Sequence, residues 1–196
     1  MTAGAVSDAA RSTHNLGSTQ PSRQNKRIDD CQPCAFEIGP ELAPFSVTFE
    51  VKQGPAGDRY IETLTVARSD APDRTDVLKV HGMVPSGLGV PFFIAATDIN
   101  FDGYNDLMLI TSKGVANALA DYWVSVTESA KFEYVGNFPV LTPNASKKTL
   151  SSYERGGEGG MLFEKKVFRF SGLTLVLVKS EKQEATGRVG QYRKTV

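Results

Sequence analysis

The stretch Phe45-Ser-Val-Thr-Phe-Glu-Val51 alternates apolar and polar side chains, which is the pattern of a half-buried β-strand. The turn residues Gly54-Pro-Ala-Gly-Asp58 follow it. Residues 59–68 then form a second run that is rich in Tyr, Ile, Thr, Leu and Val. Two such runs around a turn predict a β-hairpin.

Short apolar runs of strand length continue along the chain, with Gly and Pro residues between them. They are Asp76–Val80, Val90–Ala96, Leu107–Thr111, Tyr122–Val126, Phe132–Val135, Leu162–Phe170 and Leu173–Val178. Ser171-Gly172 offers a compact turn between the last two runs, and only residues 113–122 could hold a helical turn. This pattern predicts an all-β fold, either an antiparallel sandwich or a small propeller-like fold. The sequence shows no clean internal repeat, which counts against a regular propeller.

Composition limits the domain organisation and the partners. Lys and Arg together number 22, as do Asp and Glu, so the neutral chain has no electrostatic reason to seek nucleic acid. No apolar run reaches the roughly 18 residues of a membrane span. Residues 1–30 hold few large apolar side chains, and residues 1–20 are too polar for a secretory signal. We expect a flexible N-terminal lead at residues 1–35, one domain at residues 36–185 and a C-terminal tail at residues 186–196.

Cys31 and Cys34 form a C-x-x-C pair at the end of the predicted lead. One pair of thiols cannot complete a structural zinc site, which takes four ligands. A thioredoxin-type pair should open a helix, and Pro33 and Pro40 make a helix unfavourable here. Two interpretations stay open, a local disulfide in an oxidising compartment or a pair of inert thiols.

The segment Asp98-Ile-Asn-Phe-Asp-Gly-Tyr-Asn-Asp106 predicts a calcium-binding loop between two strands. Oxygen-bearing side chains fall at loop positions one, three, five and nine, which are Asp98, Asn100, Asp102 and Asp106. The carbonyl of Tyr104 would supply position seven, and Gly103 permits the sharp turn that wraps the chain round Ca2+. Protein oxygens would saturate the ion and no general base is nearby in sequence, so we expect a structural role. The alternative is a polar hairpin turn that happens to be acidic.

The segment Ser151-Ser-Tyr-Glu-Arg-Gly-Gly-Glu-Gly-Gly160 predicts a glycine-rich loop with a Tyr and an Arg at its entrance. Both residue types are favoured as binding anchors. The alternative is a plain mobile hairpin in which Tyr153 packs on a neighbouring strand. G-x-S-x-G, P-loop and H-E-x-x-H motifs are absent from the sequence, so we do not expect an enzyme.

Four blocks in this order resemble a family of bacterial envelope proteins related to periplasmic inhibitors of i-type lysozyme. They are Thr97-Asp-Ile-Asn-Phe-Asp-Gly-Tyr-Asn-Asp-Leu107, Asp121-Tyr-Trp123, Ser152-Tyr-x-Arg-Gly-Gly157 and Val167-Phe-Arg-Phe-x-Gly-x-Thr-Leu-Val-Leu177. The resemblance covers roughly residues 90–185. The family includes immunity proteins that protect a bacterium from peptidoglycan hydrolases delivered by a type IV secretion system.

The resemblance implies an all-β fold, a periplasmic location and inhibition of a lysozyme-like peptidoglycan hydrolase. In such inhibitors a loop that carries Ser and Tyr enters the enzyme cleft, and by position that role falls on Ser152 and Tyr153. Arg155 could pair with a catalytic carboxylate or brace the loop from within. The alternative function is a calcium-stabilised adhesion or glycan-binding module without inhibitory activity.

Overall fold

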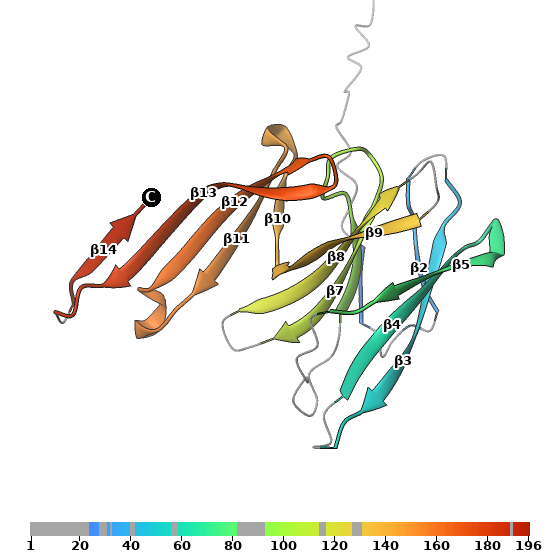
Figure 1. Cartoon of the computed structure of the whole chain (residues 1–196), viewed down its shortest axis with the longest axis horizontal. Helices are drawn as coiled ribbons and strands as arrows, with labels where there is room; N and C mark the ends of the chain where they lie inside the picture. Colours follow the sequence, from blue (N-terminus) through green and yellow to red (C-terminus); the bar gives the residue numbers. More distant parts are fainter. Residues whose placement is uncertain are drawn as a thin grey trace, which may run out of the picture.

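The computed structural model describes residues 24–27, 31, 33–39, 42–55, 59–81, 93–113, 117–126, 131–188 and 190–196. In this part of the chain three antiparallel sheets lie side by side, with two short 3-10 turns as the helical content (Figure 1). None of the sheets formed by these residues closes into a barrel. The predicted all-β, antiparallel class is therefore confirmed.

The first sheet contains the hairpin predicted from Phe45–Val51. Its strands, in spatial order, are β2 (Cys34–Phe36), β3 (Phe45–Gln53), β4 (Arg59–Arg68) and β5 (Ala71–Lys79). Phe45 pairs with Arg68 and Gln53 pairs with Arg59, with a bulge near Phe49. A disulfide joins Cys31 to Cys34 at the start of this sheet, which agrees with the first of the two interpretations of the pair.

The second sheet lies in the middle of the molecule (Figure 1). Its strands are β1 (Gln24–Arg27), β6 (Phe93–Thr97), β7 (Asp106–Lys113), β8 (Ala118–Val126) and β9 (Lys131–Pro139). The helical turn considered at residues 113–122 is replaced by strand from Ala118 onward. The reason is that Ala120 and Tyr122 pack on one face of this sheet while Trp123 packs on the other, which only an extended chain permits.

The third sheet projects from the other side of the second sheet (Figure 1). Its strands are β10 (Thr142–Asn144), β11 (Thr149–Arg155), β12 (Phe163–Ser171), β13 (Thr174–Ala185) and β14 (Tyr192–Thr195). The 3-10 turns Ala145–Lys147 and Glu158–Gly160 connect β10 to β11 and β11 to β12. The predicted turn between β12 and β13 is present, with a positive φ of 59° at Gly172.

The boundaries of the domain differ from those expected. Strand β1 falls within the predicted lead and pairs with β6, while β14 falls within the predicted tail and pairs with β13. Main-chain hydrogen bonds hold both strands in their ladders, and such bonds do not require apolar side chains.

Among the described residues no helix is long and apolar enough to cross a bilayer.

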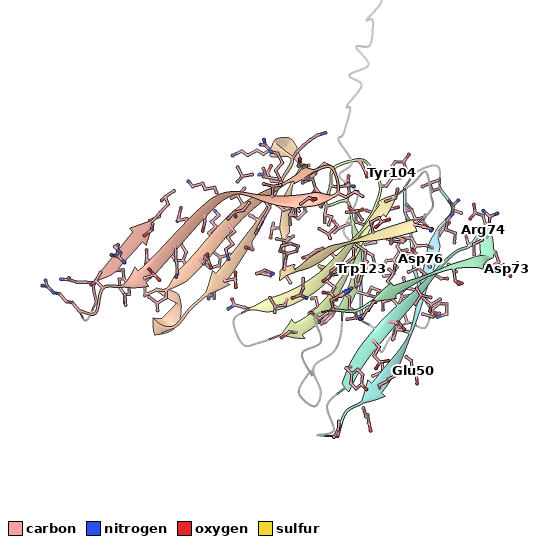
Figure 2. The ribbon with its side chains drawn as sticks, viewed as in Figure 1. Glu50, Asp73, Arg74, Asp76, Tyr104 and Trp123 are labelled. Carbon is pink, nitrogen blue, oxygen red and sulfur yellow. A yellow bond between two sulfur atoms is a disulfide. The ribbon has the colours of Figure 1, made fainter. Side chains whose placement is uncertain are left out.

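A hydrophobic core lies between each pair of neighbouring sheets. Phe45 and Leu64 of the first sheet pack against Leu107 and Trp123 of the second sheet, and Trp123 is buried inside the molecule (Figure 2). The opposite face of the second sheet packs against Leu150 and other residues of the third. The second sheet is therefore buried on both faces, and this arrangement explains the unbroken buried run within β8.

Candidate functional site

The loop between β6 and β7 reverses the chain through positive φ angles at Phe101 (65°) and Gly103 (95°). The carboxylate of Asp98 accepts hydrogen bonds from the backbone N–H groups of Phe101 at 2.7 Å and Gly103 at 3.0 Å. The amide of Asn100 donates to the carboxylate of Asp102 at 2.8 Å. The predicted ligand side chains at positions one, three and five thus lie together in one turn.

Asp106 is the buried end of this loop and is only 1% exposed. Its Oδ2 accepts hydrogen bonds from the N–H of Ile99 at 2.8 Å and of Asn100 at 3.4 Å. Its Oδ1 accepts from the N–H of Ser125 in β8 at 2.8 Å. Burial raises the pKa of Asp106 well above its usual value, although the N–H groups of Ser125 and Ile99 act to lower it. The carboxylate therefore ties both sides of the loop to the neighbouring strand.

The loop is also fixed to the segment that follows β2. The Asn105 N–H donates to the carbonyl of Ile38 at 2.6 Å, and the Asn105 amide donates to the carbonyl of Glu37 at 2.9 Å. The ring of Tyr104 lies so close to Gly39 that a Cβ on Gly39 would stand 2.8 Å from it. The loop therefore connects the second sheet to the first.

The donor set suits a hard cation in its chemistry, because carboxylate and amide oxygens are the ligands that calcium prefers. Each carboxylate oxygen that accepts one N–H can still accept a further partner. Among the described residues, however, no three or more His, Cys, Asp and Glu side chains gather closely enough to hold a metal ion. The carboxylates of the loop accept hydrogen bonds from the loop's own N–H groups, as expected for the alternative interpretation, a polar acidic turn. Calcium binding stays a prediction.

The predicted glycine-rich loop is shorter in the structure, because residues 151–155 belong to β11. Ser152 is 1% exposed on the inner face, and its hydroxyl has no hydrogen-bond partner among the described residues. Tyr153 points to the opposite face and is 49% exposed. Its ring stacks on Phe163 of β12, with centroids 5.5 Å apart. Because successive side chains of a strand point to opposite faces, Ser152 and Tyr153, which were expected to act together, lie on different sides of the sheet.

Arg155 ends β11 next to the start of β8. Its backbone N–H donates to the Asn117 side chain at 2.8 Å, and its carbonyl accepts from the same side chain at 2.9 Å. These two hydrogen bonds fix the end of the strand, while the side chain of Arg155 is exposed. The position of Tyr153, two residues earlier, is therefore defined by rigid structure rather than by a loop.

The outer face of the third sheet, which points away from the second sheet, is basic. The strand registers place on it five cationic side chains and one carboxylate beside Tyr153 and Phe163; they are Arg155, Lys165, Arg169, Lys179, Lys194 and Glu181. Lys194 binds Glu181 at 2.8 Å, and this hydrogen bond, with the nearby lysines, lowers the pKa of Glu181.

Sequence analysis did not identify this basic face, although Lys165 and Arg169 lie at the even spacing of a strand face. The opposite face of the same strands is balanced in charge, because the registers place three cationic side chains and three carboxylates on it; they are Lys166, Lys182, Arg193, Glu154, Glu164 and Glu184. Lys166 lies 3.0 Å from Glu164, and Lys182 lies 2.6 Å from Glu184. The excess positive charge thus belongs to one side of the sheet.

The fold and these surfaces define an all-β protein of three stacked antiparallel sheets. No protein-family model matches the chain, and no curated protein matches it. In fold the chain is similar to a solved structure described as a Xanthomonas Type IV Secretion System related protein, with a TM-score of 0.54 and 12% sequence identity. The match covers 88% of this chain and 92% of the other. At this identity the likeness shows a shared fold.

Proposed function

We propose that the chain is a periplasmic immunity protein that inhibits a lysozyme-like peptidoglycan hydrolase and has no enzymatic activity of its own. Two observations support the proposal besides the resemblance of the four sequence blocks. The first is the fold, which is similar to that of a protein described as related to a type IV secretion system. The second is the outer face of the third sheet.

The observation that carries the proposal is a half-exposed tyrosine at a fixed position within a basic face. The cleft of a lysozyme-like enzyme contains a pair of carboxyl groups, so a basic face is complementary to it in charge. Tyr153 supplies the aromatic anchor, and Arg155 on the same face is available to pair with a carboxylate. Ser152 faces the interior, so the proposed contact does not include it.

The test measures inhibition of peptidoglycan hydrolysis by the hydrolases that the producing bacterium secretes. Tyr153→Ala should weaken inhibition at least tenfold, because truncating a central anchor costs about 2 kcal/mol and about 1.4 kcal/mol is a factor of ten. The melting temperature should change little, since the exposed ring loses only its stacking on Phe163. Lys165→Glu should also weaken inhibition. Lys79→Glu on β5 serves as the matched control, because Lys79 is also an exposed strand lysine but lies on the first sheet.

Two results would count against this proposal. If Tyr153→Ala inhibits as well as the unchanged protein, the outer face is not the docking surface. If the protein binds isolated cell-wall glycan without any enzyme and inhibits no hydrolase, the adhesion or glycan-binding alternative takes its place.

A further inference from the structure

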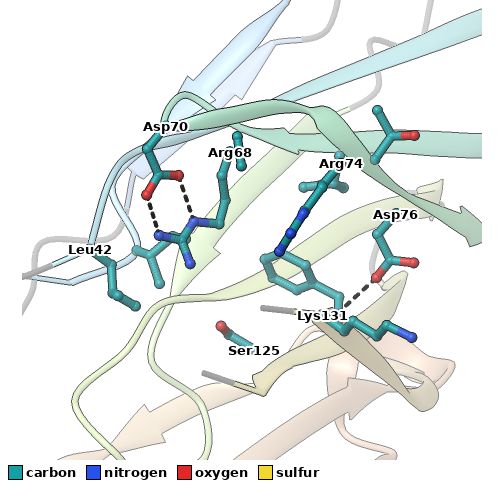
Figure 3. A pocket seen from close by; sticks show the side chains of 12 residues that line it. Leu42, Arg68, Asp70, Arg74, Asp76, Ser125 and Lys131 are labelled. Carbon is teal, nitrogen blue, oxygen red and sulfur yellow. Dashed lines mark hydrogen bonds and ion pairs between the residues drawn. The ribbon is translucent and has the colours of Figure 1, made fainter. Parts of the chain in front are cut away.

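A cavity of about 440 Å3 opens between the first and second sheets (Figure 3). Its walls come from β4 and β5, from the segment between β2 and β3, and from the end of β8 and the start of β9. Ligand pockets are commonly about 300–1,000 Å3 in volume. The cavity is therefore large enough for a small organic molecule.

One part of the cavity is apolar and fixed in shape. Its lining there consists of Ile38, Leu42, Val66 and Phe132. Ile38 and Val66 are buried in the core between the sheets. Phe132 packs on Phe45 with ring centroids 5.1 Å apart, and its backbone N–H donates to Asp76 at 3.0 Å. An apolar body could enter this part without rearranging the core.

The other part of the cavity carries an excess of positive charge. Arg68, Arg74 and Lys131 line it together with two carboxylates, Asp70 and Asp76. Arg68 uses Nε and Nη2 to bind Asp70 at 2.9 and 2.6 Å, and the remaining Nη1 is still able to donate. Asp76 already accepts the Phe132 N–H.

The guanidinium of Arg74 forms no hydrogen bond or ion pair with any other residue that the structure describes. Its side chain extends from β5 toward the middle of the cavity, between Arg68 and Asp76 in the view of Figure 3. An arginine that points into a partly apolar cavity is a geometric match for a planar anion, because its N–H groups form a rigid fork. A carboxylate fits this fork with two parallel hydrogen bonds.

We infer that this cavity binds a small carboxylate with an apolar body, the carboxylate on Arg74 and Arg68 and the body over Phe132 and Val66. Two sources share this chemistry, the C-terminus of a peptide that ends in a hydrophobic residue and a free aliphatic acid. The inference goes beyond the proposed function, because the cavity and the outer face of the third sheet have no residue in common.

The experiment titrates the isotope-labelled protein with N-acetyl-phenylalanine, octanoate and the uncharged N-acetyl-phenylalaninamide, and follows the amide resonances of β5 and β9. The two acids should bind at least tenfold more tightly than the amide, since a hydrogen bond to a charged group contributes enough for about a factor of ten. If N-acetyl-phenylalanine binds more tightly than octanoate, the carboxylate comes from a peptide C-terminus. If octanoate binds more tightly, the ligand is a free aliphatic acid.

Three variants complete the test. Arg74→Ala should weaken binding of the acids about tenfold while leaving the melting temperature unchanged, because the residue is exposed. Asp76→Asn should tighten binding of the acids, because it removes a negative charge near their carboxylate while the amide oxygen still accepts from the Phe132 N–H. Lys79→Ala lies on the same strand outside the cavity and should have no effect. Equal binding of acid and amide, no binding at millimolar concentration, or an unchanged affinity in Arg74→Ala would overturn the inference.

Discussion

Replacement of Asp106 should be among the most destabilising single changes in the second sheet. Its buried carboxylate is held by two hydrogen bonds of 2.8 Å, to Ile99 and Ser125, and by a longer one of 3.4 Å to Asn100. In Asp106→Ala all three backbone N–H groups lose their acceptor. Water cannot replace it easily, because the site lies between the loop and β8.

The magnitude follows from the number of donors left without a partner. A buried donor without an acceptor costs about 1–3 kcal/mol, so loss of the two short bonds should lower the free energy of unfolding by about 4 kcal/mol. For a chain of this length, 1 kcal/mol corresponds to about 2–4 °C in melting temperature. Asp106→Ala should therefore melt about 8–16 °C lower than the unchanged protein.

Asp106→Asn should cost less, about 2 kcal/mol, because the amide keeps one acceptor oxygen. It also avoids the burial of charge that raises the pKa of Asp106. Thermal unfolding followed by circular dichroism in calcium-free buffer measures both variants, with Asp73→Ala, an exposed change on β5, as the control. If Asp106→Ala melts within about 2 °C of the control, which is less than the effect of 1 kcal/mol, the hydrogen bonds of Asp106 do not stabilise the fold.

Three further predictions concern the same region and its neighbours. A hundredfold excess of calcium over its Kd should add about 2.7 kcal/mol of stability, and Asp102→Ala should abolish the gain; a chelator without effect on the melting temperature would contradict this. Burial, then the charge of Asp121 and a hydrogen bond to it, raise the pKa of Tyr134 from 10.0 to about 12. Because the folded state holds this proton more tightly than the unfolded state, the free energy of unfolding should fall as the pH rises from about 10 to about 12. Denaturation measured at several pH values should show that Tyr134→Phe removes this loss. Gly39→Ala should cost about 1–3 kcal/mol through its clash with Tyr104, and an equal loss in a background of Tyr104→Ala would refute that cause.

The strands of the first sheet were predicted from alternation, whereas residues 107–111 and 122–126 of the second sheet, which is buried on both faces, were predicted from continuous apolar runs. Residues Phe45–Val51 and 59–68 alternate because the first sheet covers the core with one side only, so the pattern of two is visible along the chain. The start of β8 was missed for a different reason. Residues 118–121 read Ala-Leu-Ala-Asp, without a β-branched or aromatic side chain, so this run is also compatible with a helical turn.

Strand β11 and the basic face depend on pairing between distant segments. The Ser, Glu and Arg residues of β11 do not indicate a strand by themselves, and the ladder with β12 imposes the extended form. Tyr153, Lys165 and Glu181 meet only because two registers place them side by side. A single sequence does not fix registers, so the candidate binding residues could be predicted but the face they share could not.

The burial of the second sheet on both faces has a consequence for local opening. Each core lies between neighbouring sheets, so separation of the third sheet would disrupt one core and leave the other intact, whereas opening of the second sheet would disrupt both. Amide protons of β7 and β8 should then exchange with solvent only through global unfolding. Those of β13 and β14 should exchange through a smaller, partial opening, so the proposed docking surface lies on one of the two outer sheets, whose opening disrupts a single core.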